Sequence, residues 1–257
     1  MFDAERSTDA SKMEYTTTVT NWYDRLVRHG RGKFNPLEHA MTEFGWERED
    51  PDNRPLEATD VRALYDAAES LENRLLVVAL AGWGLRSGEA ARLHQRQLVG
   101  LDSDDPRLDF QERKNGPSSV SLLYGLSVLK DRRNALAEDE TWNGYLFPSS
   151  QSSAGHIASN TVRNRFRSLA SDAGVQVRGH RPKPHMARRF WYTAYQQATA
   201  NLLDRLEGIA ADQGSASAEV VAQSYLSNEE LRTARRDAMR EKLAEALERA
   251  EAERPSE

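Results

Sequence analysis

The sequence predicts a mostly helical α+β fold with one small antiparallel sheet. Apolar residues recur at the spacing of an α-helix in most segments of the chain. One segment instead alternates apolar and polar residues on both sides of an Asn-Gly dipeptide, as the strands of a hairpin do. Of the 257 residues 39% are hydrophobic, which is enough for a substantial core in one large domain, or in one large and one small domain.

The first 45 residues are predicted to form a small helical piece of their own. We expect the polar residues 1–12 to be loose, and a helix from about Thr16 to His29, where glycines follow. The next segment is charged and contains prolines, so it reads as a linker. The expected organisation is therefore a helical segment over 1–45, a linker over 46–58, the main domain over 59–227 and a C-terminal helix over 228–257.

Capping residues and apolar spacing predict the first helices of the main domain. Thr59 or Asp60 can cap a helix whose apolar residues share one face. Residues 75–81 are apolar on every side, which predicts a buried helix. Ser87 can cap the helix that follows, with Glu89 in its first turn.

One hairpin and three further helices complete the prediction. Apolar residues alternate with polar ones around Asn115-Gly116, namely Leu108, Phe110, Val120 and Leu122. Asn-Gly is the strongest short signal for a two-residue hairpin turn. Helices are then predicted over about 160–173 and 185–206, and a long charged helix over 228–253.

Composition excludes several classes of protein. The chain has no cysteine, which excludes disulfides, cysteine-ligated zinc, iron–sulfur clusters and a cysteine nucleophile. Its six histidines do not cluster as ligands do, so we expect no metal. There is no apolar run of about 18 residues and no secretory signal at the N-terminus. We therefore expect a cytoplasmic protein with no membrane partner.

The distribution of charge is more informative than its total, which is −5. Between Asn160 and Tyr192 the sequence has eight basic residues and one acidic residue, a local charge of +7. The basic residues are Arg163, Arg165, Arg167, Arg178, Arg181, Lys183, Arg188 and Arg189. A solvated helix face is one explanation of this run, and a phosphate-binding surface is the other.

Four other residues, Arg86, His185, Lys114 and Tyr225, each have a chemical and a purely structural explanation when taken alone. Arg86 precedes a helix N-terminus, where the helix dipole disfavours a cation, yet an arginine and helix N–H groups together would bind phosphate. His185 and Arg188 share one helix face at the spacing i, i+3. Lys114 lies at the predicted hairpin tip, and Tyr225 lies further along the chain. A surface arginine, a surface histidine, a turn lysine and a half-buried packing tyrosine are the plainer explanations.

Taken in order, these residues resemble the tyrosine recombinase (phage integrase) family. Residues 81–93, AGWGLRSGEAARL, are similar to the family's first-arginine motif, T-G-L-R-x-x-E-x-x-x-L. His185-Met186-Ala187-Arg188-Arg189 is similar to the H-x-L-R-H box. Lys114 occupies the place of the catalytic hairpin lysine, and Tyr225 that of the nucleophile. The resemblance covers about residues 55–230, which correspond to the family's catalytic domain.

Two features depart from the family pattern. Ser215 stands where the family has a histidine or tryptophan upstream of the tyrosine. A hydroxyl can donate to a phosphate oxygen, but it has a shorter reach and no positive charge. The N-terminal piece is also short, because residues 13–45 resemble only the last helix and exit turn of the family's DNA-clamping module. The resemblance thus implies a truncated core-DNA-binding segment before the catalytic domain.

The resemblance implies a site-specific recombinase (integrase) that cleaves and rejoins duplex DNA through a 3′-phosphotyrosine intermediate, without a metal or small-molecule cofactor. Arg86 and Arg188 would neutralise the phosphate, and Tyr225 would attack phosphorus. Lys114 would protonate the leaving 5′-oxygen, and His185 would position the phosphate or accept the tyrosine proton. Ser215 completes the implied catalytic set. The residues expected to bind DNA are Arg163, Arg165, Arg167, Arg181, Lys183 and Arg189.

The implied partners are double-stranded DNA and further copies of the chain assembled on it. The C-terminal helix would either dock on a neighbouring protomer or pack in cis. Two alternatives stay open. A catalytically weakened or inactive DNA-binding remnant fits Ser215 and the short N-terminus, whereas a helical interaction protein without a DNA role fits the acidic net charge. Steep salt dependence of DNA binding would exclude the second alternative.

Overall fold

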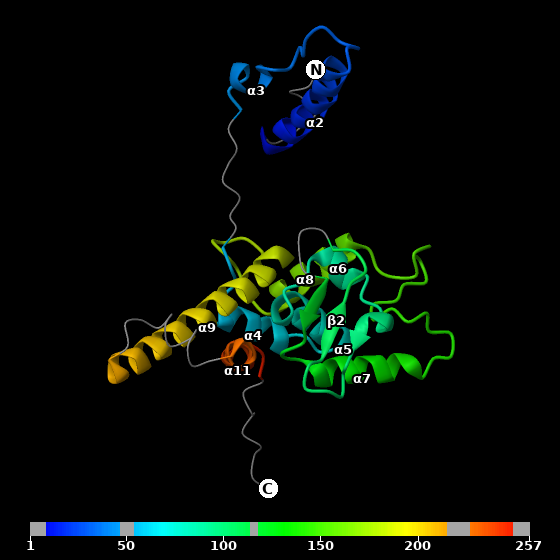
Figure 1. Cartoon of the computed structure of the whole chain (residues 1–257). Helices are drawn as coiled ribbons and strands as arrows, with labels where there is room; N and C mark the ends of the chain where they lie inside the picture. The colour runs from blue at the N-terminus through cyan, green and yellow to red at the C-terminus, as the bar shows by residue number, and fades with distance from the viewer. Residues whose placement is uncertain (1–8, 47–53, 114–117, 215–226, 249–257) are drawn as a thin grey trace. The chain divides into compact units, whose positions relative to one another are not determined.

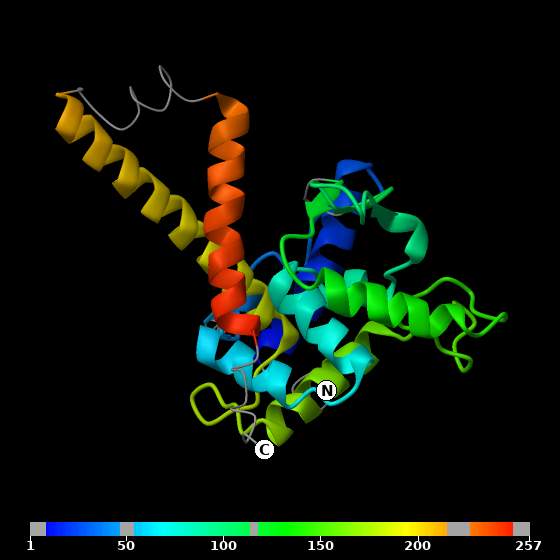
Figure 2. The same cartoon turned by 90° about the horizontal axis from the view of Figure 1, so that it is seen from below.

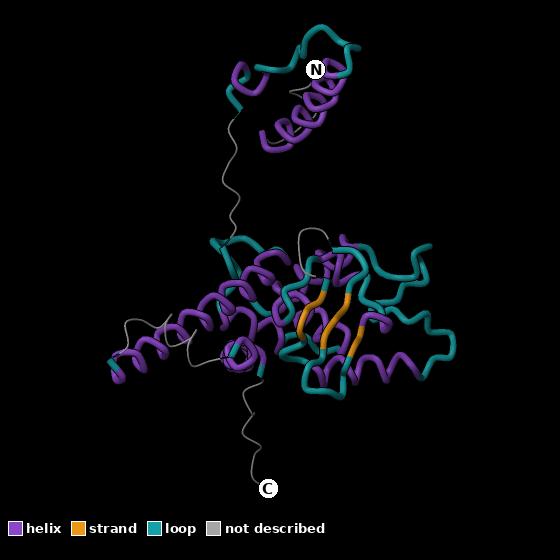
Figure 3. The backbone as a smooth tube through the Cα atoms, in the orientation of Figure 1, coloured by secondary structure: helices purple, strands orange, loops and turns teal. Residues whose placement is uncertain are grey.

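The computed structural model describes residues 9–46, 54–113, 118–214 and 227–248 (Figure 1). The chain divides into two compact units, Met1–Asp52 and Asn53–Glu257. Helices predominate in both units, and the strands lie in the second (Figure 3). Within the described residues, no helix combines the length and hydropathy that crossing a bilayer requires. The mostly helical α+β class is therefore confirmed.

The first unit contains α2 (Asp9–Arg28) and the short α3 (Ala40–Glu43). Because α2 begins at Asp9, the expectation that residues 1–12 are loose is wrong for 9–12. The amide of Asn35 donates to Asp24 Oδ1 at 2.7 Å and to the carbonyl of Thr20 at 3.3 Å, so it holds the following segment against α2. The unit nevertheless leaves large apolar side chains exposed, among them Trp22, Phe34 and Phe44, because so few residues cannot enclose a core.

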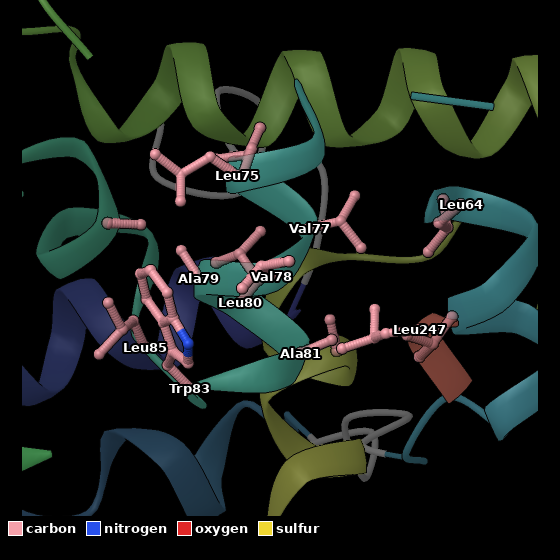
Figure 4. Packing of buried hydrophobic residues seen from close by; sticks show 14 of the residues in the cluster. Leu64, Leu75, Val77, Val78, Ala79, Leu80, Ala81, Trp83, Leu85 and Leu247 are labelled. Atoms are coloured by element: carbon pink, nitrogen blue, oxygen red, sulfur yellow. The ribbon is translucent and has the colours of Figure 1, made fainter. Parts of the chain in front are cut away.

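The predicted buried helix over 75–81 is confirmed and forms the centre of the second unit. It consists of α5 (Leu71–Val77), continued by a π-helical turn, η1 (Val78–Gly82). All seven predicted residues are at most 1% exposed. Figure 4 shows Val77 and Ala81 on the side of this helix that faces Leu64 of α4 (Ala58–Asp66) and Leu247 of the C-terminal helix. Burying an all-apolar helix requires partners on every side, and the surrounding helices supply them.

The caps differ from the predicted ones by one to three residues. Glu57 is the N-cap of α4, and Asp60, a predicted cap, instead accepts the Glu57 backbone N–H at 3.1 Å. Arg86 is the N-cap of α6 (Ser87–Ala91), so Ser87 is the first helical residue and not the cap. Glu89 caps the start of this helix, because its carboxylate accepts the Arg86 N–H at 2.8 Å.

The predicted hairpin is confirmed as two strands of a three-stranded antiparallel sheet. The strands are β1 (Leu98–Val99), β2 (Arg107–Asp109) and β3 (Ser119–Ser121), in the order β1-β2-β3. Leu108 lies opposite Val120, as the alternation predicts. The dipeptide Asn115-Gly116 lies outside the described residues. The sequence reasoning missed β1, the 3-10 turn η2 (Gln95–Gln97) and helix α7 (Leu126–Ala137).

The last helices are α8 (Ser159–Asp172), α9 (Pro184–Gln213) and α11 (Asn228–Leu247). Proline at the first position of α9 suits a helix start, and α9 continues beyond the predicted end at residue 206. In the single chain α11 packs in cis against α4, η1 and α9 (Figure 2). It buries Met239, Leu243, Ala246 and Leu247.

Replacing Gly84 with alanine tests how closely the turn before α6 packs against Trp191 of α9. Gly84 has φ +62°, and a Cβ there would lie 2.9 Å from Trp191 Cδ2. We expect a loss of about 1 kcal/mol for the left-handed backbone and about 1–3 kcal/mol more for the overlap, measured by urea unfolding. Gly174→Ala is the matched control, because Gly174 has φ +66° and no atom within 4 Å of a Cβ. Equal losses in the two variants would contradict the expected overlap.

Candidate active site

Three arginines from three elements converge on the carboxylate of Glu89. Arg86 is the N-cap of α6, Arg113 follows β2, and Arg188 lies in the first turns of α9. Arg86 Nη1 lies 2.7 Å and Arg113 Nε 3.0 Å from Oε1, while Arg188 Nη1 lies 3.6 Å from Oε2. One carboxylate thus faces three guanidinium groups, which leaves an excess of two positive charges.

These four side chains differ in how far solvent reaches them. Glu89 is 9% exposed, Arg113 6% and Arg188 15%, whereas Arg86 is 40% exposed. Arg113 donates from Nε and Nη2 to both oxygens of Glu89, a fork-like contact that holds the segment after β2 next to α6. Arg86 is therefore the member of the group most open to a ligand.

The cations lower the pKa of Glu89. Burial alone raises it, but hydrogen bonds from Arg113, from the Arg86 backbone and from the Arg86 guanidinium outweigh burial and bring the pKa from 4.5 to about 2. Glu89 is therefore ionised at neutral pH and serves as a permanent counter-charge. This carboxylate also occupies the backbone N–H of Arg86, the N-cap residue of α6.

Hydrogen bonds to Gly84 and Tyr192 orient the guanidinium of Arg188. Its Nη1 donates to the carbonyl of Gly84, and its Nη2 donates to Tyr192 Oη at 2.7 Å. The guanidinium carbon also lies 5.0 Å from the centre of the Tyr192 ring. Burial lowers the pKa of Arg188, and the like charge of Arg86 lowers it further. An arginine keeps its charge under such shifts, so the site stays cationic.

A surface hollow of about 630 Å³ lies beside Arg188. It is lined by Pro55, His185, Arg188, Arg189, Tyr192, Thr193 and Gln196. His185 and Arg188 therefore share one face of α9, as their spacing predicts. Cationic side chains around a solvent-accessible hollow attract anions, and phosphate fits paired arginines in both charge and shape.

The structure brings Arg86, His185 and Arg188 of the predicted catalytic set into one region. Lys114, Ser215 and Tyr225 lie outside the described residues. No group of three or more histidine, aspartate or glutamate side chains that could hold a metal occurs in the described part of the chain.

The six predicted DNA-binding residues lie on α8, on the segment that follows it and on α9. Five are exposed, namely Arg163, Arg167, Arg181, Lys183 and Arg189. Arg165 is instead paired with Glu72 of α5 at 2.5 Å, and Glu72 also lies 3.7 Å from Arg132. Arg165 therefore links α8 to α5 in this structure.

Sequence reasoning missed three residues of the site. It gave Glu89 a place only in a helix turn, although Glu89 follows Arg86 at the motif spacing L-R-x-x-E. Tyr192 follows Arg188 by one helical turn, so the i, i+4 spacing could have indicated the contact. Arg113 had no local signal, because its partner Glu89 is 24 residues away in the sequence.

Comparisons with known proteins agree with this fold. The family described as phage integrase matches residues 54–209. The crystal structure of a lambda integrase (75–356) dimer bound to a COC′ core site has 17% identity and a TM-score of 0.50, with 71% of this chain and 65% of that chain covered. The integrase from mycobacterium phage Brujita has 18% identity and a TM-score of 0.48, with 95% and 79% covered. Among curated proteins no sequence matches significantly.

At these identities the likeness to the lambda structure shows the fold alone. The family match is stronger, because it extends over more than half of the chain and includes Arg86, Glu89, Arg113, His185 and Arg188. The chain therefore belongs to the phage integrase family.

Proposed function

We propose that this protein is a site-specific DNA recombinase that cleaves and rejoins duplex DNA through a 3′-phosphotyrosine intermediate. The observation that carries the proposal is the convergence of Arg86, Arg113 and Arg188 on one carboxylate, beside a hollow that His185 also lines. Glu89 offsets one of the three charges. The remaining charge suits a phosphodiester whose negative charge grows in the transition state.

In this reaction the Tyr225 hydroxyl attacks phosphorus, so a bond forms between the tyrosine oxygen and phosphorus and the bond to the 5′-oxygen breaks. Lys114 gives the proton that the 5′-oxygen needs, and His185 positions the phosphate or takes the tyrosine proton. Arg86 and Arg188 donate to the non-bridging oxygens, with Ser215 as a further donor. The reverse step joins the 5′-oxygen of the same or another strand. The resemblance to the family supports the roles of Lys114, Ser215 and Tyr225.

The proposed partner is double-stranded DNA, with several copies of the chain assembled on it. A lambda integrase structure is described as a dimer bound to a core site, which supports both parts of this proposal. We assign residues 1–45 to a helical DNA-binding segment, 46–58 to a linker and 59–227 to the catalytic domain. The boundary between the two compact units falls within the proposed linker. Residues 228–257 remain a candidate protomer contact.

A DNA-binding remnant is the second candidate function. Ser215 supports it, because a serine in place of histidine supplies no positive charge to the phosphate. Losing one donor that stabilises transition-state charge costs about 10²–10³ in rate, so slow cleavage and no cleavage are both consistent with this substitution.

A suicide-substrate experiment separates these functions. The protein is incubated with nicked duplex DNA from its own genomic neighbourhood and denatured in detergent, and binding is measured in parallel at low and moderate salt. The proposal predicts a detergent-resistant protein–DNA adduct and, for six to ten phosphate contacts, a loss of affinity of about 10³–10⁵ between 50 and 200 mM salt. Salt-dependent binding without an adduct would favour the remnant. Absence of binding would contradict both.

A further inference from the structure

Tyr192 lies one helical turn after Arg188 on α9 and carries a hydroxyl beside its guanidinium. Arg188 Nη2 donates to Tyr192 Oη at 2.7 Å, so the phenol oxygen is the acceptor in this hydrogen bond. The phenol therefore keeps its own proton for another partner. Within the described residues, no side chain or carbonyl accepts that proton.

The position of the Tyr192 ring is fixed on the protein side and open on the other. The ring meets the edge of Trp191, with centroids 5.0 Å apart, and Trp191 is in turn stacked on Tyr195 at 5.3 Å. Tyr192 is nevertheless 50% exposed, and it lines the hollow together with His185 and Arg188. The hydroxyl is therefore held beside a space that a ligand can enter.

The contact with Arg188 makes the Tyr192 hydroxyl a stronger donor. A hydroxyl whose oxygen accepts from a guanidinium is polarised by that bond, and successive hydrogen bonds strengthen one another. Among the described residues Arg188 donates to Gly84 and Tyr192, which uses two of the five N–H groups of a guanidinium. An anion in the hollow can therefore accept from Arg188 and from Tyr192 at the same time.

We propose that the Tyr192 hydroxyl is a catalytic hydrogen-bond donor to a non-bridging oxygen of the reacting phosphate, while its own oxygen accepts from Arg188. The inference rests on the proposed function and adds a neutral donor to the arginines of the site. The hydroxyl keeps its proton throughout, so Tyr192 neither attacks phosphorus nor protonates the 5′-oxygen. Because the contact strengthens as charge grows on the phosphate oxygen, it accelerates cleavage more than it tightens binding.

Replacing Tyr192 with phenylalanine removes the hydroxyl and keeps the ring. We expect single-turnover cleavage of a nicked duplex to become about 10- to 100-fold slower, with an affinity for the duplex within about threefold of wild type. Tyr195→Phe is the matched control, because Tyr195 is a tyrosine of the same helix outside the set of described residues that line the hollow. It is expected to cleave within about twofold of wild type, and thermal unfolding shows whether each variant is folded.

A substrate with a methylphosphonate at the cleaved position tests the contact itself. One non-bridging oxygen is replaced by a methyl group, which accepts no hydrogen bond, and the two diastereomers each lack a different oxygen. Release of the strand with the 5′-hydroxyl is measured for each. We expect Tyr192→Phe to slow one diastereomer as it slows the ordinary phosphodiester, and to cleave the other within about twofold of wild type.

A double variant separates this contact from an effect exerted only through the orientation of Arg188. If the Tyr192 hydroxyl touches the phosphate, Tyr192→Phe is expected to slow cleavage at least about fivefold further in the Arg188→Ala protein. A residue that acts only by positioning Arg188 would cause no further loss once Arg188 is gone.

The outcomes distinguish this inference from the proposed function. If wild-type protein cleaves no duplex, the proposed function itself fails. If wild type cleaves and Tyr192→Phe is as fast as Tyr195→Phe, the assignment of Tyr192 is wrong. Equal slowing of both diastereomers, or no further loss in the Arg188→Ala protein, would also overturn it, because Tyr192 would then only position Arg188.

Discussion

Replacing Glu89 with glutamine is expected to lower the free energy of unfolding by about 3 kcal/mol near neutral pH. The change leaves three guanidinium groups without their counter-charge, and removing one partner from a buried ion pair is strongly destabilising. Urea unfolding measures the loss. Asp102→Asn is the control, because Asp102 lies 2.6 Å from Lys130 but is 91% exposed, and we expect it to leave the free energy of unfolding nearly unchanged.

The stability difference between wild type and Glu89→Gln is also expected to depend on pH. The pKa of Glu89 is about 2 in the folded protein and 4.5 ordinarily, so its stabilising effect is fully present above pH 4.5 and is lost as the pH falls towards 2. At 1.36 kcal/mol per pKa unit, the lost contribution is about 3 kcal/mol. Wild type should therefore lose more stability than Glu89→Gln between pH 5 and pH 2.5. Parallel losses would show that Glu89 is not held ionised by the arginines.

Replacing Arg188 with alanine is expected to slow adduct formation by about 10³. Arg188 is mostly buried and fixed by Gly84 and Tyr192, so its donors are held in place before the phosphate arrives. Arg188→Lys is expected to recover only part of the rate, because an ammonium group cannot donate bidentately as a guanidinium does. The measurement is the single-turnover rate of adduct formation on a nicked duplex.

A control variant shows whether a loss of adduct-formation rate in Arg188→Ala is specific to that arginine. Arg96 is an exposed arginine on η2, and Arg96→Ala is expected to keep the wild-type rate within about twofold. Thermal unfolding of each variant shows whether the fold is intact. A folded Arg188→Ala protein that forms the adduct within about tenfold of wild type would contradict the role given to Arg188.

Signals contained within a short stretch of sequence predicted much of the fold. The hairpin was predictable because both strands alternate beside an Asn-Gly turn, and the helix over 75–81 because it is apolar throughout. Helix α7 was missed because it buries few apolar side chains, Val128 and Leu129 among them, and so has little periodicity. Strand β1 has only two residues, too few to show alternation.

The site residues that lie in recognisable sequence motifs were predictable. Arg86, His185 and Arg188 were found through the order of their motifs, and the structure brings them into one region. Arg113 and Arg165 depend on tertiary contacts, with Glu89 and with Glu72, that no local pattern encodes. The sequence alone showed which residues are charged and in which order the motifs occur. Tertiary packing determined which arginines are paired with a carboxylate inside the protein.

Mapping the residue that becomes linked to DNA identifies the nucleophile. Tyr192 provides an internal comparison, because it is half-exposed, its hydroxyl accepts a hydrogen bond from Arg188, and it lines the hollow beside Arg188. The adduct from a nicked duplex is digested with nuclease and protease, and the modified peptide is identified by mass spectrometry. We expect a phosphotyrosine linkage at Tyr225, no adduct in Tyr225→Phe, and an adduct that still forms in Tyr192→Phe. A linkage at Tyr192 or any other residue, or an adduct that persists in Tyr225→Phe, would contradict this expectation.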